Sequence, residues 1–137
     1  MNKGENMNWK KLYNETKKYV NEQDISAFVH IGQVASGIVT DKGNMYFGIC
    51  VDGKCDWGTC AERNAIMEML KHGEAKVTHV VTVDRNGEIR MPCGLCREAF
   101  MQLHPDNKNI EFLVNLETRE TIKLHELLPD WWGEDRF

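Results

Sequence analysis

Hydrophobic and polar residues alternate along this chain with two different periods, and each period predicts a type of element. Between Trp9 and Asn21 the apolar positions recur at roughly helical spacing among lysines, which predicts an amphipathic helix over one face of the core. From Phe28 to Thr40 the β-branched residues predict a strand, and the polar turn at residues 41–44 leads into another strand over Met45 to Val51. A β-hairpin is the simplest arrangement of these two strands.

The second half of the chain alternates between predicted helices and strands. A helix is expected to begin at about Cys60 and to end at Gly73, and a buried strand follows over Val77 to Val83. Pro92 precedes a helix from about Cys93 to Leu103, because proline is tolerated in a first turn that has no backbone hydrogen bond to lose. The remaining expected elements are strands over Ile110 to Leu116 and Thr121 to Leu124 and a short helix over Leu124 to Leu128.

This order of elements predicts an α/β fold of three layers. A five-stranded sheet is expected in the middle, with helices on both faces, and it is mixed because it begins with an antiparallel hairpin. The length of 137 residues fits one domain, residues 1–137, since domains most often hold ~100 to 150 residues and a second core would be undersized.

Composition and charge exclude several classes of function. The chain is 42% hydrophobic and 28% charged, which is ordinary for a folded domain. Its net charge is -4, and its lysines and arginines form no stripe that could follow a phosphate backbone, so long nucleic acid is not expected as a partner and nucleic-acid editing is disfavoured. The apolar runs are short, and the polar start Met1 to Lys11 lacks the apolar stretch of a secretory signal. We therefore expect a cytoplasmic protein that does not enter a membrane.

Cysteines supply the most specific chemical signal in the sequence. Their number, five, is odd, and in a reducing compartment a disulfide framework is not expected. Cys93 and Cys96 form a Cys-x-x-Cys pair at one predicted helix start, and Cys60 begins the other helix, with one strand between them. Two helices joined by one strand of a sheet can present their N-termini side by side. The three thiolates would then meet at one point, in a set that suits tetrahedral zinc.

Three cysteine ligands favour a catalytic zinc site over a structural one. A structural site normally has four protein ligands, and no second Cys-x-x-Cys or His-x-His pair stands at the usual spacing. The fourth position would be left for a water, whose pKa zinc lowers to ~7. The alternatives are buried thiols, or a zinc closed by Cys50 or Cys55. A closed site would make the chain a non-catalytic zinc module that binds a partner through Trp131 and Trp132.

Glu62 is the candidate for moving protons. It lies two residues after Cys60, too close to be a comfortable fellow ligand, yet able to point into the same cavity. One carboxylate can protonate a ring nitrogen and then a leaving amine if a dry site raises its pKa. The alternative is an ordinary first-turn glutamate stabilised by the helix dipole. The negative charge of three thiolates would be offset by the helix N-termini and by Arg63 and Arg97. The five histidines share no ligand spacing, which indicates surface or packing roles.

Two segments of the chain resemble the cytidine deaminase family, in its free-nucleoside branch. They are Thr59-Cys60-Ala61-Glu62-Arg63 and Pro92-Cys93-Gly94-Leu95-Cys96-Arg97. The similarity extends further, because Ser26-Ala27-Phe28 and Ile31-Gly32 look like the family's Ser-x-Phe-x-Val-Gly segment with one residue inserted. Glu126-Leu127-Leu128-Pro129, followed by an aromatic residue, looks like the family's C-terminal end, so the resemblance covers nearly the whole chain.

The resemblance implies a site and an assembly. It implies zinc on the three cysteines of these motifs, with Glu62 as general acid and base. It also implies that Phe28, and Trp132 from a neighbouring subunit, stack on the substrate's base. Family members of this length are usually tetramers with sites shared between subunits, so the resemblance implies a homotetramer.

Two departures from the family's pattern bear on the substrate. Where cytidine deaminases carry Asn-x-Glu to bind the ribose, this chain has Cys50-Val51-Asp52, in which a weak hydrogen-bonding thiol replaces an amide. Glu98 stands where that branch usually has Gln, and the related blasticidin S deaminases can carry Glu there. The leading hypothesis is hydrolytic deamination of cytidine or deoxycytidine, giving the uracil product and ammonia. The alternative is deamination of a cytosine-containing antibiotic or another modified nucleoside.

Overall fold

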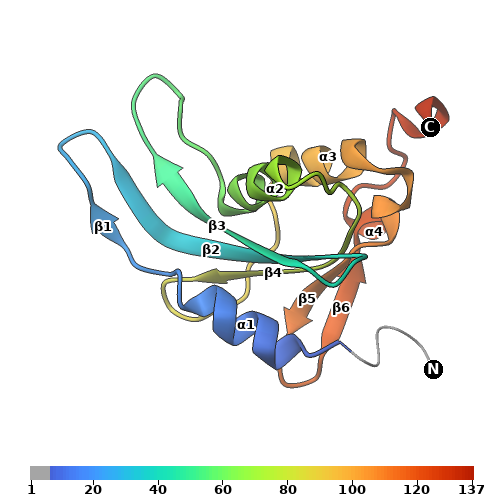
Figure 1. The fold of residues 1–137 in the computed structure, drawn as a ribbon, viewed down its shortest axis with the longest axis horizontal. Helices are drawn as coiled ribbons and strands as arrows, with labels where there is room; N and C mark the ends of the chain where they lie inside the picture. The colour runs from blue at the N-terminus through green and yellow to red at the C-terminus, as the bar shows by residue number, and fades with distance from the viewer. Residues whose placement is uncertain (1–6) are drawn as a thin grey trace.

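The chain folds into three layers, which a computed structural model describes over residues 7–137 (Figure 1). Residues 1–6 of the polar start, where the sequence predicts no secretory signal, lie outside this range. In chain order the elements are α1 (Trp9–Lys17), β1 (Gln23–Asp24), β2 (His30–Thr40), β3 (Met45–Asp52), α2 (Ala61–Lys71), β4 (Val77–Asp84), α3 (Gly94–Leu103), the 3-10 helix η2 (Pro105–Asn109), β5 (Glu111–Asn115), β6 (Glu120–Lys123), α4 (Leu124–Leu127) and the 3-10 helix η3 (Glu134–Arg136).

One mixed sheet of six strands forms the middle layer. The long strand β2 pairs with β3 along one edge, while the other edge pairs first with β1 and then with β4. All of these pairs are antiparallel. The pair β4 and β5 is parallel, and α3 makes the crossover between these strands, since a parallel pair needs a connection longer than a hairpin turn. An antiparallel β6 completes the sheet.

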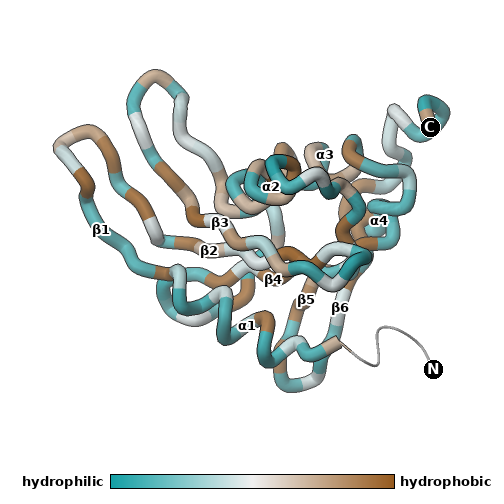
Figure 2. The backbone as a smooth tube through the Cα atoms, viewed as in Figure 1, coloured by the Kyte–Doolittle hydropathy of each residue, from teal (hydrophilic) through white to brown (hydrophobic). Residues whose placement is uncertain are grey.

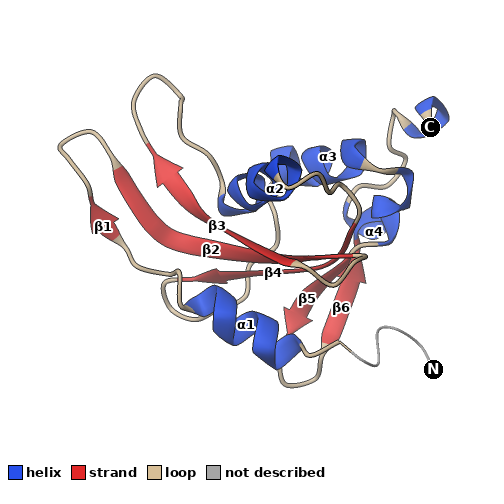
Figure 3. Cartoon of the chain, viewed as in Figure 1, coloured by secondary structure: helices blue, strands red, loops and turns tan. Residues whose placement is uncertain are grey.

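Helices cover both faces of this sheet, as the sequence predicts. In Figure 3, α1 lies against one face and α2, α3 and α4 lie on the other. Side chains alternate between the faces, so neighbouring residues of β4 enter different cores: Val80 packs with α2 and α3, and Val81 packs with α1. Figure 2 shows hydrophobic residues along β2 and β4, which are buried on both sides.

The sheet has six strands, one more than the five that the sequence predicts. The missing strand is β1, which has only two residues, Gln23 and Asp24, both exposed and polar. Such a segment carries no hydrophobic period. It is placed by the backbone at Gly32, whose φ of +82° suits glycine and whose carbonyl accepts the N–H of Asn21 at 3.0 Å. A Cβ at Gly32 would lie 2.1 Å from the oxygen of Asn21.

Most other predicted boundaries hold to within two residues. The first helix ends earlier than expected, at Lys17, and the first long strand begins at His30 and not at Phe28. Within residues 7–137, every helix is too short or too polar to cross a lipid bilayer.

Candidate active site and metal centre

The sulfur atoms of Cys60, Cys93 and Cys96 meet at one point between the starts of α2 and α3. All three sulfurs lie within 4.8 Å of one another. Cys60 Sγ is 3.5 Å from Cys93 Sγ, and Cys93 Sγ is 3.6 Å from Cys96 Sγ. These separations are far too long for a disulfide, whose sulfurs are about 2.0 Å apart. They are close to the separation of about 3.8 Å between sulfurs bound to one tetrahedral zinc at about 2.3 Å.

Two of these cysteines occupy equivalent positions, because Cys60 and Cys93 are the N-cap residues of α2 and α3. Both have extended backbone, with ψ of 154° and 169°, and neither side chain makes a capping hydrogen bond. The thiols are therefore free to bind a metal at the positive ends of two helices, where anionic ligands are stabilised. Strand β4 joins the two helices and places both starts at the same end of the sheet, as the sequence predicts.

The local charge balance also fits a cation. Cys96 is fully buried, and burial and the nearby Glu62 carboxylate both raise the pKa of its thiol. Glu62 is itself only 4% exposed, and its Oε1 lies 3.9 Å from Cys96 Sγ. Two groups that become anionic, Cys96 and Glu62, are thus packed together away from water. A divalent cation between the sulfurs would supply the missing positive charge and favour the thiolate forms.

Glu62 lies in the first turn of α2 with its carboxylate beside the three sulfurs. Burial raises its pKa, against the opposing effects of a hydrogen bond from Thr82 and the charge of Arg63. Thr82 Oγ1 on β4 donates to Glu62 Oε2 at 3.1 Å, which fixes the carboxylate and leaves Oε1 on the side of the thiols. A buried carboxylate with a raised pKa can hold and release a proton near neutral pH.

The two arginines have different surroundings. Arg63 Nη2 donates to Cys60 Sγ at 3.5 Å, so its charge lies against one thiol as expected. Arg97 instead donates to the backbone carbonyls of Pro92, at 2.8 Å, and Leu127, at 3.0 Å. It forms no hydrogen bond to a cysteine within the described residues. Arg97 therefore fastens the segment before Cys93 to α4, and an effect of its charge on the sulfurs stays a prediction.

An open cleft of about 340 Å³ lies beside the thiols. Its wall includes Cys50 and Asp52 from β3 and Cys60 and Arg63 from the start of α2. Val51 and Thr59 exchange two backbone hydrogen bonds of 2.9 Å, which close the loop over residues 52–58 and bring the end of β3 against α2. The Cys50-Val51-Asp52 segment therefore lies next to the proposed metal ligands, where a substrate's sugar could reach it.

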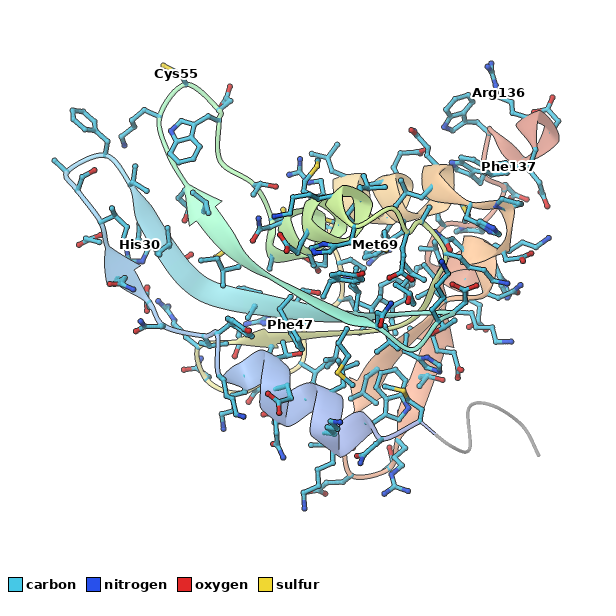
Figure 4. All side chains as sticks on the ribbon, in the orientation of Figure 1. His30, Phe47, Cys55, Met69, Arg136 and Phe137 are labelled. Atoms are coloured by element: carbon cyan, nitrogen blue, oxygen red, sulfur yellow. The ribbon has the colours of Figure 1, made fainter. Side chains whose placement is uncertain are left out.

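Cys50 and Cys55 are not part of the sulfur cluster in the described residues. Cys50 Sγ points toward Gln33 Oε1, at 3.9 Å, and Cys55 is exposed at the tip of the β3–α2 loop, where Figure 4 labels it. The arrangement gives a metal three protein ligands and disfavours the closed, four-cysteine alternative.

The two aromatic residues expected to stack on the base lie at the periphery. Phe28 is 66% exposed in the β1–β2 loop, and Trp132 is 62% exposed near the C-terminus. The sequence left the role of Glu98 open, and the structure gives it one. Its carboxylate accepts the indole N–H of Trp131 at 2.8 Å and that of Trp132 at 3.3 Å.

Thr82 is the site residue that sequence reasoning missed. It lies in the β-branched run of β4, where a threonine is indistinguishable from the packing residues around it. Side chains alternate along a strand, and Val81 and Val83 face α1. The same alternation could have placed Thr82 on the opposite face of the sheet, with Glu62.

Comparisons with known proteins agree with this geometry. Residues 9–111 match the family model described as the cytidine and deoxycytidylate deaminase zinc-binding region. A cytidine deaminase of Mycobacterium tuberculosis is 27% identical over 110 residues, covering 80% of this chain and 71% of that protein. One from Halalkalibacterium halodurans is 28% identical over 100 residues, covering 71% of this chain and 74% of that protein.

Solved structures show the same fold. The crystal structure of cytidine deaminase from Mycobacterium tuberculosis superposes with a TM-score of 0.75 at 22% identity, covering 93% of this chain and 98% of that one. The family model spans well over half of the 137 residues and includes all three clustered cysteines and Glu62. The chain therefore belongs to the zinc-dependent cytidine and deoxycytidylate deaminase family.

Proposed function

We propose that residues 1–137 form one deaminase domain that hydrolyses a free cytosine nucleoside, cytidine or deoxycytidine, to the uracil nucleoside and ammonia. The observation that carries this proposal is the buried Glu62 carboxylate beside three convergent thiols at the edge of an open cleft. In this proposal Cys60, Cys93 and Cys96 hold zinc, which when bound supplies an activated water at neutral pH.

Glu62 is assigned the proton transfers. Its carboxylate accepts a proton from the attacking water and delivers one to the ring nitrogen next to the reacting carbon. It then removes the proton of the new hydroxyl group on that carbon and delivers it to the departing amine, so the carbon–nitrogen bond breaks, a carbonyl forms and ammonia leaves. The hydrogen bond from Thr82 holds the carboxylate in place, and burial raises its pKa, which favours the protonated form that donates.

The cleft favours an uncharged substrate over a nucleotide. Two carboxylate residues, Asp52 and Asp56, line it. Arg63 also lines it, with the Nη2 of its guanidinium directed at Cys60. A 5′-phosphate would meet repulsion from these carboxylates, whereas a ribose hydroxyl could donate to Asp52.

The substrate alternatives can be separated by direct turnover. The named relatives are cytidine deaminases, which favours a simple cytosine nucleoside over a cytosine-containing antibiotic. Ultraviolet spectra recorded while the zinc-loaded protein acts on cytidine, deoxycytidine, deoxycytidylate and blasticidin S compare all four. We expect the first two to be deaminated fastest. Turnover of blasticidin S or deoxycytidylate far above that of both nucleosides would overturn the substrate assignment.

The assembly is proposed to be a homotetramer with shared sites. Large apolar side chains stay exposed on the β1–β2 and β3–α2 loops, on α2 and α3 and near the C-terminus: Phe28, Trp57, Met67, Leu95 and Trp132. Burial of such side chains between subunits would stabilise an oligomer. Light scattering on the purified protein should give four times the chain mass of 15.8 kDa. A cytoplasmic location is also proposed, because three metal-binding thiolates must remain reduced.

A further inference from the structure

His30 lies between two carboxylates, with one at each ring nitrogen. Its Nδ1 is 2.6 Å from Asp24 Oδ1, and its Nε2 is 2.9 Å from Glu22 Oε2. A neutral imidazole has one N–H, so one of its nitrogens would face a carboxylate oxygen with no proton between them. Only the imidazolium donates to both partners, and the geometry therefore belongs to the charged form.

This bridge stands at the base of the loop that carries Phe28. Strand β1 pairs with β2 through only two residue pairs, Gln23 with Ile31 and Asp24 with His30. So short a hairpin has little stability of its own, and ordering it depends on side-chain contacts. The His30 bridge joins the two arms of the hairpin directly below residues 25–29. Figure 4 labels His30 at this position, between β1 and β2.

The loop lines a hollow that adjoins the substrate cleft. Phe28 and His30 line a hollow whose far wall is Asp52 and Gly53, and these two residues also line the cleft beside the thiols. His30 is in addition the direct cross-strand partner of Asp52 in the β2–β3 ladder. One residue thus contacts both segments from which the proposed substrate contacts come.

We propose that His30 is a positioning residue for the substrate, which by bridging Glu22 and Asp24 holds the Phe28 loop over the end of the cleft. The proposal rests on the function proposed above. It concerns a feature of this chain, since two residues separate Phe28 from Ile31 where the family's pattern has one.

Because the bridge requires the imidazolium, substrate affinity should depend on pH. Charged groups lie around His30 on the elements packed against it. They are Glu22 just before β1, Asp24 within β1, Arg85 after β4, which donates to Glu22, and Asp52 and Lys54 at the end of β3. The hydrogen bonds to Glu22 and then to Asp24 raise the pKa of His30 above its ordinary value of 6.5. The bridge is complete below this raised pKa and is lost as the pH rises through it.

Asp24→Asn offers the cleanest test. Asp24 contacts His30 and is otherwise largely exposed, so the substitution keeps the shape and removes one charge. We would measure KM and kcat for cytidine from about pH 6 to about pH 9 on the zinc-loaded protein, and follow the His30 ring by NMR over the same range. In the wild type, KM should rise with the His30 titration while kcat changes little. In Asp24→Asn, both the KM rise and the titration should move together to lower pH.

Two histidine variants complete the comparison. His30→Gln should raise KM at neutral pH roughly three- to tenfold, because the competent loop conformation is populated only part of the time, and should remove the alkaline rise. His72→Gln is the matched control: His72 also pairs with a glutamate, Glu68, but at the opposite end of α2 from the thiols. It should leave KM and its pH dependence unchanged.

The outcomes separate this inference from the proposed function. A wild type that turns over none of the cytosine nucleosides would refute the function. Suppose instead that turnover is normal and Asp24→Asn shifts the His30 titration but leaves the pH dependence of KM unchanged. That result would overturn the positioning role of His30 and leave the proposed function intact. A fall in kcat with unchanged KM in the His30 and Asp24 variants would also overturn it.

Discussion

At the scale of single residues, the metal site depends on three cysteines with different surroundings. Cys93 is exposed, Cys60 is half-buried and Cys96 is fully buried beside Glu62. Spacing in the sequence identified all three, because Cys-x-x-Cys and a cysteine at a helix start are local patterns. The partners that tune them, such as Thr82, come from distant parts of the chain and carry no local pattern.

Replacing a cluster cysteine should remove the metal, whereas replacing Cys50 should not. Cys96→Ser keeps the size of the side chain but offers a poor zinc ligand, so the purified variant should carry almost no zinc and have no turnover. Cys50→Ser should retain about one zinc per chain, because its sulfur lies against Gln33 and outside the cluster. Metal analysis of both variants checks this. Loss of zinc in Cys50→Ser would point to a fourth cysteine ligand.

At the scale of elements, the site depends on how closely α2 lies against β3. Asn64 Oδ1 accepts the backbone N–H of Ile49 at 2.9 Å, and Gly48 lets the two backbones approach. A Cβ added at Gly48 would lie 2.3 Å from the backbone nitrogen of Ala65. The helix, and with it Cys60 and Glu62, would have to move away from the sheet.

Gly48→Ala should therefore affect both stability and the metal. We expect the free energy of unfolding to fall by about 2 kcal/mol, the usual cost of overpacking, and zinc to bind more weakly because α2 shifts. Urea denaturation and zinc titration measure the two effects. Gly94→Ala is the control, since the added methyl meets no atom within 4 Å. Equal stability of the two variants would contradict the close-contact argument.

Elements with a strong hydrophobic period were predictable, and those without one were not. The runs in β2, β4 and the inner face of α2 are long and apolar, so their type and order follow from the sequence. Strand β1 is two exposed polar residues, and tertiary hydrogen bonding alone defines it. The His30 bridge could not be predicted for the same reason, because strand β1 brings Glu22 and Asp24 to His30.

At the scale of the whole molecule, acid stability should depend on Glu74, which joins the α2–β4 turn to β3. Its Oε2 accepts hydrogen bonds from Tyr46, at 2.5 Å, and Asn44, at 2.8 Å. The bond from Tyr46 is the largest cause that lowers the pKa of Glu74 to about 2. A carboxyl whose pKa is lowered by folding stabilises the protein above its unfolded value of 4.5, and this stability is lost as the pH falls toward 2.

Glu74→Gln tests this dependence. Wild-type stability should decline more steeply than that of the variant over the acid range, because the glutamine has no proton to gain. Urea midpoints measured at several pH values between about 5 and about 3 give the two slopes. Identical slopes for both proteins would show that Glu74 gains no stabilising partners on folding.

The order of layers and the proposed sharing of sites among subunits also concern the whole molecule. The sequence predicted the three layers, since helix and strand alternate and the parallel pair requires a crossover. The proposed tetramer could not be derived from the residues alone. Exposed aromatic side chains such as Phe28 and Trp132 look the same in the sequence whether they pack against a subunit or bind a substrate.

The most direct test of the proposed mechanism is cytidine turnover by Glu62→Gln, with the zinc content of the same sample. The substitution keeps the size of the side chain and the hydrogen bond from Thr82 but removes the proton carrier. We predict that the variant binds zinc as fully as the wild type, while kcat falls by roughly a hundredfold to ten-thousandfold. A zinc-loaded Glu62→Gln that deaminates cytidine at the wild-type rate would contradict the assignment of Glu62 and the mechanism built on it.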